Sequence, residues 1–209
     1  MQVDIFETEK KYKVIYADPP WSYQNWCDSK NGAAKAHYQT MKQKDIEALP
    51  VGRIADKDSI LFMWATFPKL QEALETIKAW GFEYKTIGFC WVKRNKNGTW
   101  FKGIGFYTKS NSEVCLIATK GKPPKKTVHH SVSQLVETVR EQHSKKPDEV
   151  RERIVEFTGD VPRIELFARQ TAAGWDSWGN EVGKFDTNQM SIFDSGGGNH
   201  SKDKEVRNA

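Results

Sequence analysis

Short apolar segments along this chain alternate with stretches in which apolar residues recur every three or four positions. The segments Val14–Ala17, Ser59–Thr66 and Tyr84–Val92 are short and rich in β-branched or aromatic residues, which is typical of strands buried inside a sheet. Between Pro68 and Gly81 the apolar residues recur at helical spacing, with proline at the start and glycine at the end. The first half of the chain therefore predicts strands that alternate with a helix.

The second half continues this alternation. Strands are predicted at Glu113–Thr119 and Arg163–Ala168, with a helix over 146–159 that has proline and acidic residues in its first turn. Alternating strands and helices predict an α/β fold, a doubly wound sheet with helices on both faces. Residues 1–183 are expected to form one domain, and residues 184–209, which lose the core pattern, a disordered tail.

The first predicted strand ends abruptly in Asp18-Pro19-Pro20-Trp21. Two prolines can neither continue a sheet ladder nor enter a helix, so the chain must leave the sheet at this point. Proline has a fixed φ and restricts the residue before it to extended conformations. The Asp18 carboxylate and the Pro19 carbonyl should therefore be held at the carboxyl edge of the sheet, where open α/β sheets bind ligands.

A carboxylate beside a fixed carbonyl presents two acceptors, which suits an amino group. Trp21 and Tyr23 would add flat faces, so the exocyclic amine of a nucleobase fits this loop. When the two acceptors take hydrogen bonds from both amine hydrogens, they favour tetrahedral geometry at the nitrogen. Its lone pair is then directed at an electrophile. The alternative is a strand that ends in an ordinary proline turn. The long segment from Ser22 to Thr40 has no hydrophobic period and is interpreted as a lid over the target base.

Charge along the chain favours an anionic partner. The net charge is +5, and ten basic residues lie between Lys85 and Lys126 against one acid, Glu113. Aromatic residues are interleaved with these charges, and Asn97-Gly98 predicts a turn that would project them. Lysine and arginine could contact phosphates while the aromatic rings stack on bases, which predicts nucleic-acid binding. The alternative is a solvated charged loop. The aromatic residues are Trp100, Phe101, Phe106 and Tyr107.

Other classes of protein are disfavoured. The longest apolar run, Ile60–Phe67, is too short to span a bilayer and no leader sequence is evident, so a soluble cytoplasmic protein without a membrane partner is expected. The three cysteines are widely spaced and form neither a disulfide framework nor a metal knuckle. His129 and His130 lack partners at metal-ligand spacing, so no metal site is expected.

The Asp18-Pro19-Pro20-Trp21 motif resembles the signature of the adenine-N(6) methyltransferase family that includes the catalytic subunit of the eukaryotic mRNA adenosine methyltransferase and small bacterial and phage enzymes. The likeness covers about residues 12 to 183. It continues in Tyr38-Gln39-Thr40-Met41, Leu49-Pro50-Val51, Leu61-Phe62-Met63-Trp64, Ala79-Trp80-Gly81-Phe82, Trp91-Val92-Lys93, Lys146-Pro147-Asp148-Glu149, Glu165-Leu166-Phe167-Ala168-Arg169 and Trp178-Gly179-Asn180-Glu181.

This resemblance implies a Rossmann-like methyltransferase sheet with a permuted motif order and S-adenosyl-L-methionine as methyl donor. The amine-binding motif Asp18-Pro19-Pro20-Trp21 would be catalytic. The residues expected to bind the donor are Asp18, Lys146, Arg169, Asn180 and Glu181. The residues expected to bind the substrate are Tyr23, Tyr38, Lys93, Arg94, Asn111 and Lys122, with Asn111 and Glu113 in the pocket wall.

Two classes of function remain open at this point. The first is an active adenine methyltransferase, on DNA in preference to RNA because the chain carries no RNA-recognition module, with a duplex base flipped into the site. The second is a catalytically silent partner subunit that lends a basic surface to an active relative. A homodimer or a pairing with a related subunit is compatible with either.

Overall fold

The computed structural model describes residues 1–23, 40–105, 107–123, 131–141 and 145–184. Most of the expected lid, with Tyr38, and the expected tail lie outside these residues, as do Phe106, His129 and His130. In chain order the elements are β1 (Tyr12–Ala17), α1 (Gln43–Glu47), α2 (Val51–Ile54), β2 (Ala55–Ala65), the 3₁₀ turn η2 (Phe67–Lys69), α3 (Leu70–Ala79), β3 (Glu83–Arg94), β4 (Ser112–Lys120), β5 (Leu135–Val139), α4 (Asp148–Thr158), β6 (Arg163–Leu166) and β7 (Asp176–Trp178).

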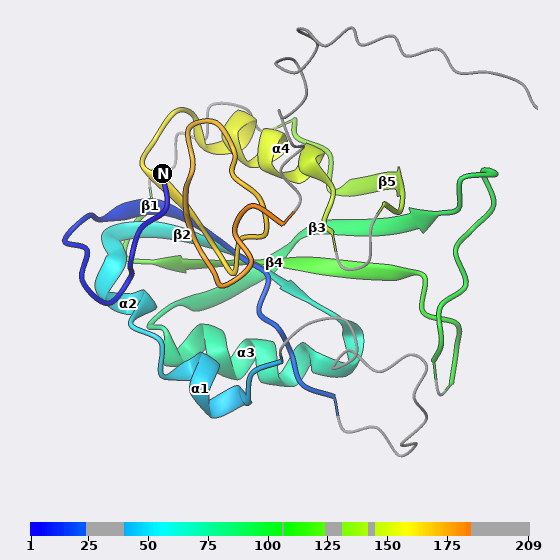
Figure 1. Cartoon of the computed structure of the whole chain (residues 1–209), viewed down its shortest axis with the longest axis horizontal. Helices are drawn as coiled ribbons and strands as arrows, with labels where there is room; N and C mark the ends of the chain where they lie inside the picture. The colour runs from blue at the N-terminus through cyan, green and yellow to red at the C-terminus, as the bar shows by residue number, and fades with distance from the viewer. Residues whose placement is uncertain (24–39, 106, 124–130, 142–144, 185–209) are drawn as a thin grey trace, which may run out of the picture.

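The seven strands form one sheet in the order β5-β3-β4-β2-β1-β6-β7 (Figure 1). Neighbouring strands are parallel except around β4, which is antiparallel to both β2 and β3. The expected α/β sheet is confirmed, but β4 runs against the parallel direction that a doubly wound sheet implies. The reason is local, because β3 returns directly into β4 without a crossover helix.

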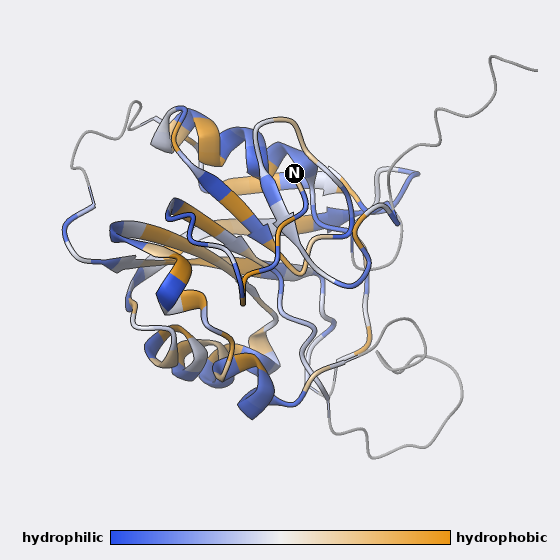
Figure 2. Ribbon diagram, turned by 60° about the vertical axis from the view of Figure 1, so that its left-hand side comes forward, coloured by the Kyte–Doolittle hydropathy of each residue, from blue (hydrophilic) through white to orange (hydrophobic). Residues whose placement is uncertain are grey.

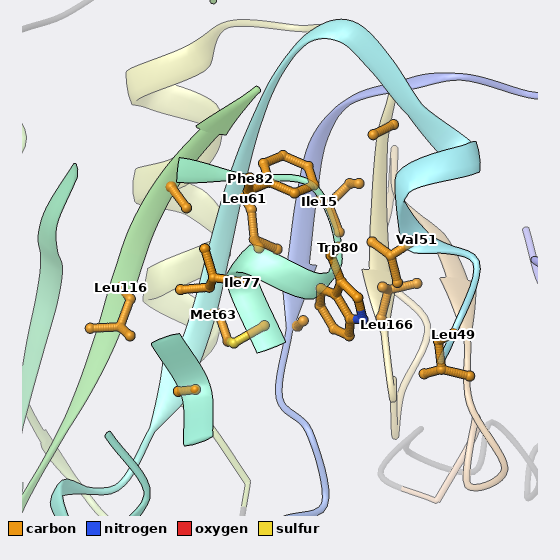
Figure 3. Close-up of a cluster of buried hydrophobic side chains, with 14 of the residues drawn as sticks. Ile15, Leu49, Val51, Leu61, Met63, Ile77, Trp80, Phe82, Leu116 and Leu166 are labelled. Atoms are coloured by element: carbon orange, nitrogen blue, oxygen red, sulfur yellow. The ribbon is translucent and has the colours of Figure 1, made fainter. Parts of the chain in front are cut away.

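Helices cover both faces of the sheet, and strand alternation divides the core between them. In β1, Ile15 and Ala17 point to the face covered by α1, α2 and α3, while Val14 and Tyr16 point to the face covered by α4. Figure 3 shows the first cluster, in which Ile77 of α3 and Trp80, just after the helix, pack over β1 and β2. The apolar colouring of the strands in Figure 2 agrees with burial on both faces.

Two helices have the boundaries that the sequence signals predict. Pro68 lies in η2, which leads directly into α3, and the backbone turns at Gly81, where φ is +81°. Pro147 is the N-cap of α4, with Asp148 and Glu149 in the first turn. α3 buries Ala73 and Ile77 against the sheet, and each fully buried large apolar side chain contributes about 1.5–3 kcal/mol.

The strand directions bring distant parts of the chain to one edge of the sheet. Ala17 at the end of β1 is in register with Met63 of β2 and with Leu166 of β6, so the residues that follow these strands lie together. Because β4 is antiparallel, its first residues also reach this edge, with Val114 opposite Ala65. This edge, called the carboxyl edge below, holds Asp18, Glu113 and the chain after β6. Among the described residues, no helix is long and apolar enough to cross a membrane.

Candidate active site

Four charged side chains form a continuous chain of ion pairs at the carboxyl edge. The Lys146 ammonium, just before α4, lies 2.7 Å from Asp18 Oδ2 and 3.3 Å from Glu113 Oε2. The other oxygen of Glu113 accepts a hydrogen bond from Lys93 at the end of β3. The side chains are 11% to 21% exposed, so these charges are mostly withdrawn from water. Two cations and two anions alternate, which leaves the cluster without net charge.

Burial and pairing act in opposite directions on these groups. Burial by itself raises the pKa of Glu113, but the ammonium groups of Lys146 and Lys93 outweigh it and lower the pKa to about 2. Burial likewise disfavours the charged form of Lys146, and the carboxylates of Asp18 and Glu113 reverse this, so its pKa is raised above the ordinary value. Both groups are therefore charged at neutral pH, and each stabilises the other.

The loop after β1 is held by backbone and side-chain hydrogen bonds. The Trp21 amide donates to the Pro19 carbonyl at 2.8 Å, and the Met41 amide donates to the Pro20 carbonyl at 3.0 Å. The Tyr23 hydroxyl lies 2.6 Å from Thr66 Oγ1, just after β2. The Pro19 carbonyl keeps its second lone pair, and the second oxygen of Asp18 has no hydrogen-bond partner among the described residues. Within the described part of the chain, two neighbouring residues of this loop thus keep a hydrogen-bond acceptor without a partner.

Trp21 does not present the open flat face that the sequence suggests. Its ring is only 5% exposed and packs in the core, and its indole N–H donates to the Trp64 carbonyl at 3.2 Å. The reason is that the chain turns back over the end of β2 immediately after the two prolines. In the structure Trp21 anchors the loop that carries Asp18 and Pro19.

The backbone after β6, beside Asp18, is also constrained in its conformation. Phe167 has a φ of +59°, an unfavourable backbone conformation for a residue with a side chain. Gly179 approaches so closely that a Cβ atom there would lie 2.7 Å from the Ala168 carbonyl oxygen. The Ala168 amide also donates to the Trp178 carbonyl at 2.9 Å. The backbone that leads to Arg169 is therefore fixed by β7 and requires glycine at position 179.

A pocket lies between this backbone and the ion-pair chain. It is lined by Asp18, Lys145, Lys146, Arg151, Glu165, Phe167, Arg169 and Gln170. Arg169 pairs with Glu181 across 3.3 Å. The pocket thus offers carboxylates to an amino group or to hydroxyl groups, and cations to a carboxylate. Lys146 also lines a second hollow, beside Trp91 and Thr138.

Arg151 and Glu165 also line this pocket, although the sequence pattern did not predict either of them as a site residue. Arg151 of α4 is buried and binds both oxygens of Glu165 in β6, at 2.6 Å and 3.0 Å. Burial is the first effect on Glu165 and raises its pKa above the ordinary value, although the Arg151 guanidinium opposes the shift. A charged residue on the apolar face of the predicted helix was the available signal for Arg151.

The structure separates some of the other expected site residues. Lys122 follows β4 at the opposite edge of the sheet, where its amide donates to Asp58, and the length of β4 places it roughly 20 Å from the carboxyl edge. It is therefore not part of this site, because the antiparallel direction of β4 carries it away. Arg94 is turned to Glu137 and to the Trp100 ring, and the Asn111 carbonyl accepts from the Lys93 amide. Asn180 is exposed just after β7, next to Glu181.

Comparison with known proteins places this chain among methyltransferases. The family model described as MT-A70 matches residues 12–181. The type II methyltransferase M.MunI of Mycoplasma sp is 39% identical over 189 residues, which cover 83% of this chain and 78% of that protein. The METTL3 catalytic subunit of the N(6)-adenosine-methyltransferase of Homo sapiens is 27% identical over 176 residues, covering 82% of this chain and 28% of that protein.

A putative N(6)-adenosine-methyltransferase of Medicago truncatula, described as MT-A70-like, is 30% identical over 179 residues. That match covers 82% of this chain and 26% of the plant protein. This chain therefore spans only about a quarter of the length of the human and plant relatives, whereas it spans most of the Mycoplasma protein.

Proposed function

Because this chain belongs to the MT-A70 family of adenine-N(6) methyltransferases, which use S-adenosyl-L-methionine, we propose that it methylates the 6-amino group of adenine in DNA. The observation that carries the proposal is the Asp18–Lys146 ion pair, next to two available acceptors and a pocket of mixed charge. DNA is preferred over RNA because the relative that this chain matches along most of its length is named a type II methyltransferase, a name that points to DNA.

The residues around the pocket fit the methyl donor. Asp18 can accept from the amino group of its methionine part, and Lys146 and Arg169 can bind its carboxylate. Glu165, Glu181 and Asn180 can accept from or donate to the ribose hydroxyls and the adenine edge. When bound, S-adenosyl-L-methionine supplies a methyl group on a positively charged sulfur atom that is also the leaving group.

The acceptor amine is positioned by the loop after β1. The second oxygen of Asp18, which has no partner among the described residues, and the remaining lone pair of the Pro19 carbonyl accept hydrogen bonds from the two amine hydrogens, which turns the nitrogen lone pair toward the pocket. The prolines and the Trp21 anchor fix both acceptors in advance, so little ordering is required in the transition state. Lys146 compensates the charge of Asp18, and no strong base is required before transfer.

The deciding experiment measures transfer of a labelled methyl group to double-stranded DNA, single-stranded DNA and RNA, followed by nucleoside analysis. We expect N(6)-methyladenine in DNA from the wild type and a loss of at least about 100-fold in Asp18→Ala. Asp45→Ala, an exposed acid of α1, is the matched control and should retain activity. Methylation of RNA alone would overturn the DNA assignment. No transfer to any polymer, with nucleic acid still bound, would favour the silent partner subunit.

A further inference from the structure

The connection between β3 and β4, of which residues 95–105 and 107–111 are described, forms an arm that projects beyond the carboxyl edge of the sheet (Figure 1). Its base is closed by backbone hydrogen bonds, from the Lys93 amide to the Asn111 carbonyl and from the Phe101 amide to the Lys93 carbonyl, both at 3.0 Å. Farther out, the Gly103 amide donates to the Ser110 carbonyl at 2.8 Å. The arm is therefore a paired structure that continues the β3–β4 hairpin.

Two arginines from the body of the protein brace the first part of the arm. The Arg94 guanidinium lies 3.1 Å from the centre of the Trp100 ring and donates to the Gly98 carbonyl at 3.1 Å. Arg140, just after β5, lies over the Phe101 ring at 4.4 Å. Arg94 is held in turn by Glu137 of β5. These contacts fix residues 98–101 of the arm to the sheet.

The arm exposes large apolar and cationic side chains to solvent. Ile104 is 89% exposed, Tyr107 is fully exposed and Trp100 is 46% exposed. Lys102 and Lys109 are exposed beside them, with no ion-pair partner among the described residues. Such exposure of large apolar groups on a braced element is typical of a binding surface. The lysines select an anionic partner, because no acid lies on the arm to balance them.

We propose that the arm binds the nucleic acid beside the target adenine, with Lys102 and Lys109 on phosphates and Tyr107 against a base. This inference rests on the proposed function, since it names the surface through which the same substrate is held. Lysines can contact the phosphate backbone of a nucleic acid, and an exposed aromatic ring between them can stack on a base.

The position of the arm supports this assignment. The arm begins directly after Lys93 and Arg94, and Lys93 belongs to the ion-pair chain that ends at Asp18. The hollow lined by Lys146 and Trp91 lies at the ends of β3 and β5, between the base of the arm and α4. The base of the arm thus lies at the same edge of the sheet as Asp18.

The test compares Lys102→Gln/Lys109→Gln and Tyr107→Ala with the wild type in fluorescence-anisotropy titrations of a labelled DNA at several salt concentrations. We expect the double variant to bind on the order of tenfold more weakly, with a plot of log Kd against log salt that is shallower by about 1.8, because two phosphate contacts are lost. Tyr107→Ala should lower the affinity for single-stranded DNA about tenfold, with little change in its salt dependence. The control Lys57→Gln/Lys78→Gln removes the same charge from exposed positions elsewhere and should bind like the wild type.

Binding and transfer are measured separately, so the two proposals fail differently. A wild type that methylates no nucleic acid refutes the proposed function, and the titrations then still test the arm. Arm variants that bind DNA with wild-type affinity and salt dependence overturn the inference. Light scattering gives a second test. If the wild type is a dimer, and the arm variants are monomers with unchanged DNA affinity, the inference is overturned, because the arm would then be a subunit interface.

Discussion

The Lys146 ammonium lies 2.7 Å from Asp18 although 128 positions separate the two residues in the chain. β1 delivers Asp18 to the carboxyl edge, and the segment before α4 delivers Lys146 to the same place. The pair is only partly exposed and extends through Glu113 to Lys93. Several consequences of this arrangement can be measured.

Replacing Lys146 by Met removes the cation and keeps most of the side-chain volume. Asp18 would then lose its cation and Glu113 would keep only Lys93, in a poorly hydrated site, which should lower the free energy of unfolding by about 3–5 kcal/mol. Methyl transfer should fall at least about 100-fold, measured as kcat/KM at a temperature where the variant is folded. Lys120→Met, at the opposite edge of the sheet, is the control and should retain activity. Equal activity in the two variants would contradict a role for the ion pair.

Glu113 should make stability depend on pH in the acid range. Its pKa is about 2 in the folded protein and near 4.5 ordinarily, so its contribution of about 3 kcal/mol is complete above pH 4.5 and is lost as pH falls through 2. Urea unfolding of the wild type and Glu113→Gln should differ by about 3 kcal/mol at pH 7 and by roughly half of that at pH 3. The control Glu83→Gln, an exposed partner of Lys85, should show a difference below about 0.5 kcal/mol throughout. If the difference in unfolding free energy between the wild type and Glu113→Gln does not change with pH, this account is refuted.

Trp21→Phe tests whether the Trp21 hydrogen bond positions the loop that carries Asp18, apart from its contribution to stability. The substitution keeps an aromatic ring but removes the hydrogen bond to the Trp64 carbonyl, at a cost of about 1 kcal/mol in stability. Trp80→Phe removes an equivalent buried bond, to the Ile46 carbonyl at 2.9 Å, far from Asp18. We expect both variants to lose similar stability in thermal unfolding, while only Trp21→Phe loses about tenfold in kcat. If both variants keep wild-type kcat, the Trp21 bond does not position the loop.

Arg151 and Glu165 should be strongly coupled. Arg151→Met leaves the buried Glu165 carboxylate without its partner, which should lower stability by about 3–5 kcal/mol. Adding Glu165→Gln should recover part of that loss, and a double-mutant cycle from denaturant unfolding should give a coupling above about 1 kcal/mol. The same cycle on Arg153 and Glu149, an i,i+4 pair on α4, should give less than about 0.5 kcal/mol. Similar coupling in the two pairs would contradict the role of burial.

Local features of this chain were predictable from sequence because their causes are local. The prolines after Ala17 end β1, Pro147 and the acids after it begin α4, and Gly98 permits the turn in the arm. β-branched and aromatic runs are found as strands for the same reason, although β2 begins four residues before the predicted segment, at Ala55. The short strands β5 and β7 were not predicted, because so few residues carry too weak a period.

The partners of the polar residues were decided only by the tertiary structure. A hydrophobic period reports that a strand is buried but not its direction, and it is the antiparallel direction of β4 that brings Glu113 to Lys146 and removes Lys122 from the site. Trp21 is an anchor for an equivalent reason, since the end of β2 happens to lie beneath it. The sequence by itself determined the longer strands, the two helices α3 and α4, and the end of β1 at the prolines after Asp18. The folding of distant strands onto one edge determined which charges face each other, because ion pairs form through space and leave no pattern along the chain.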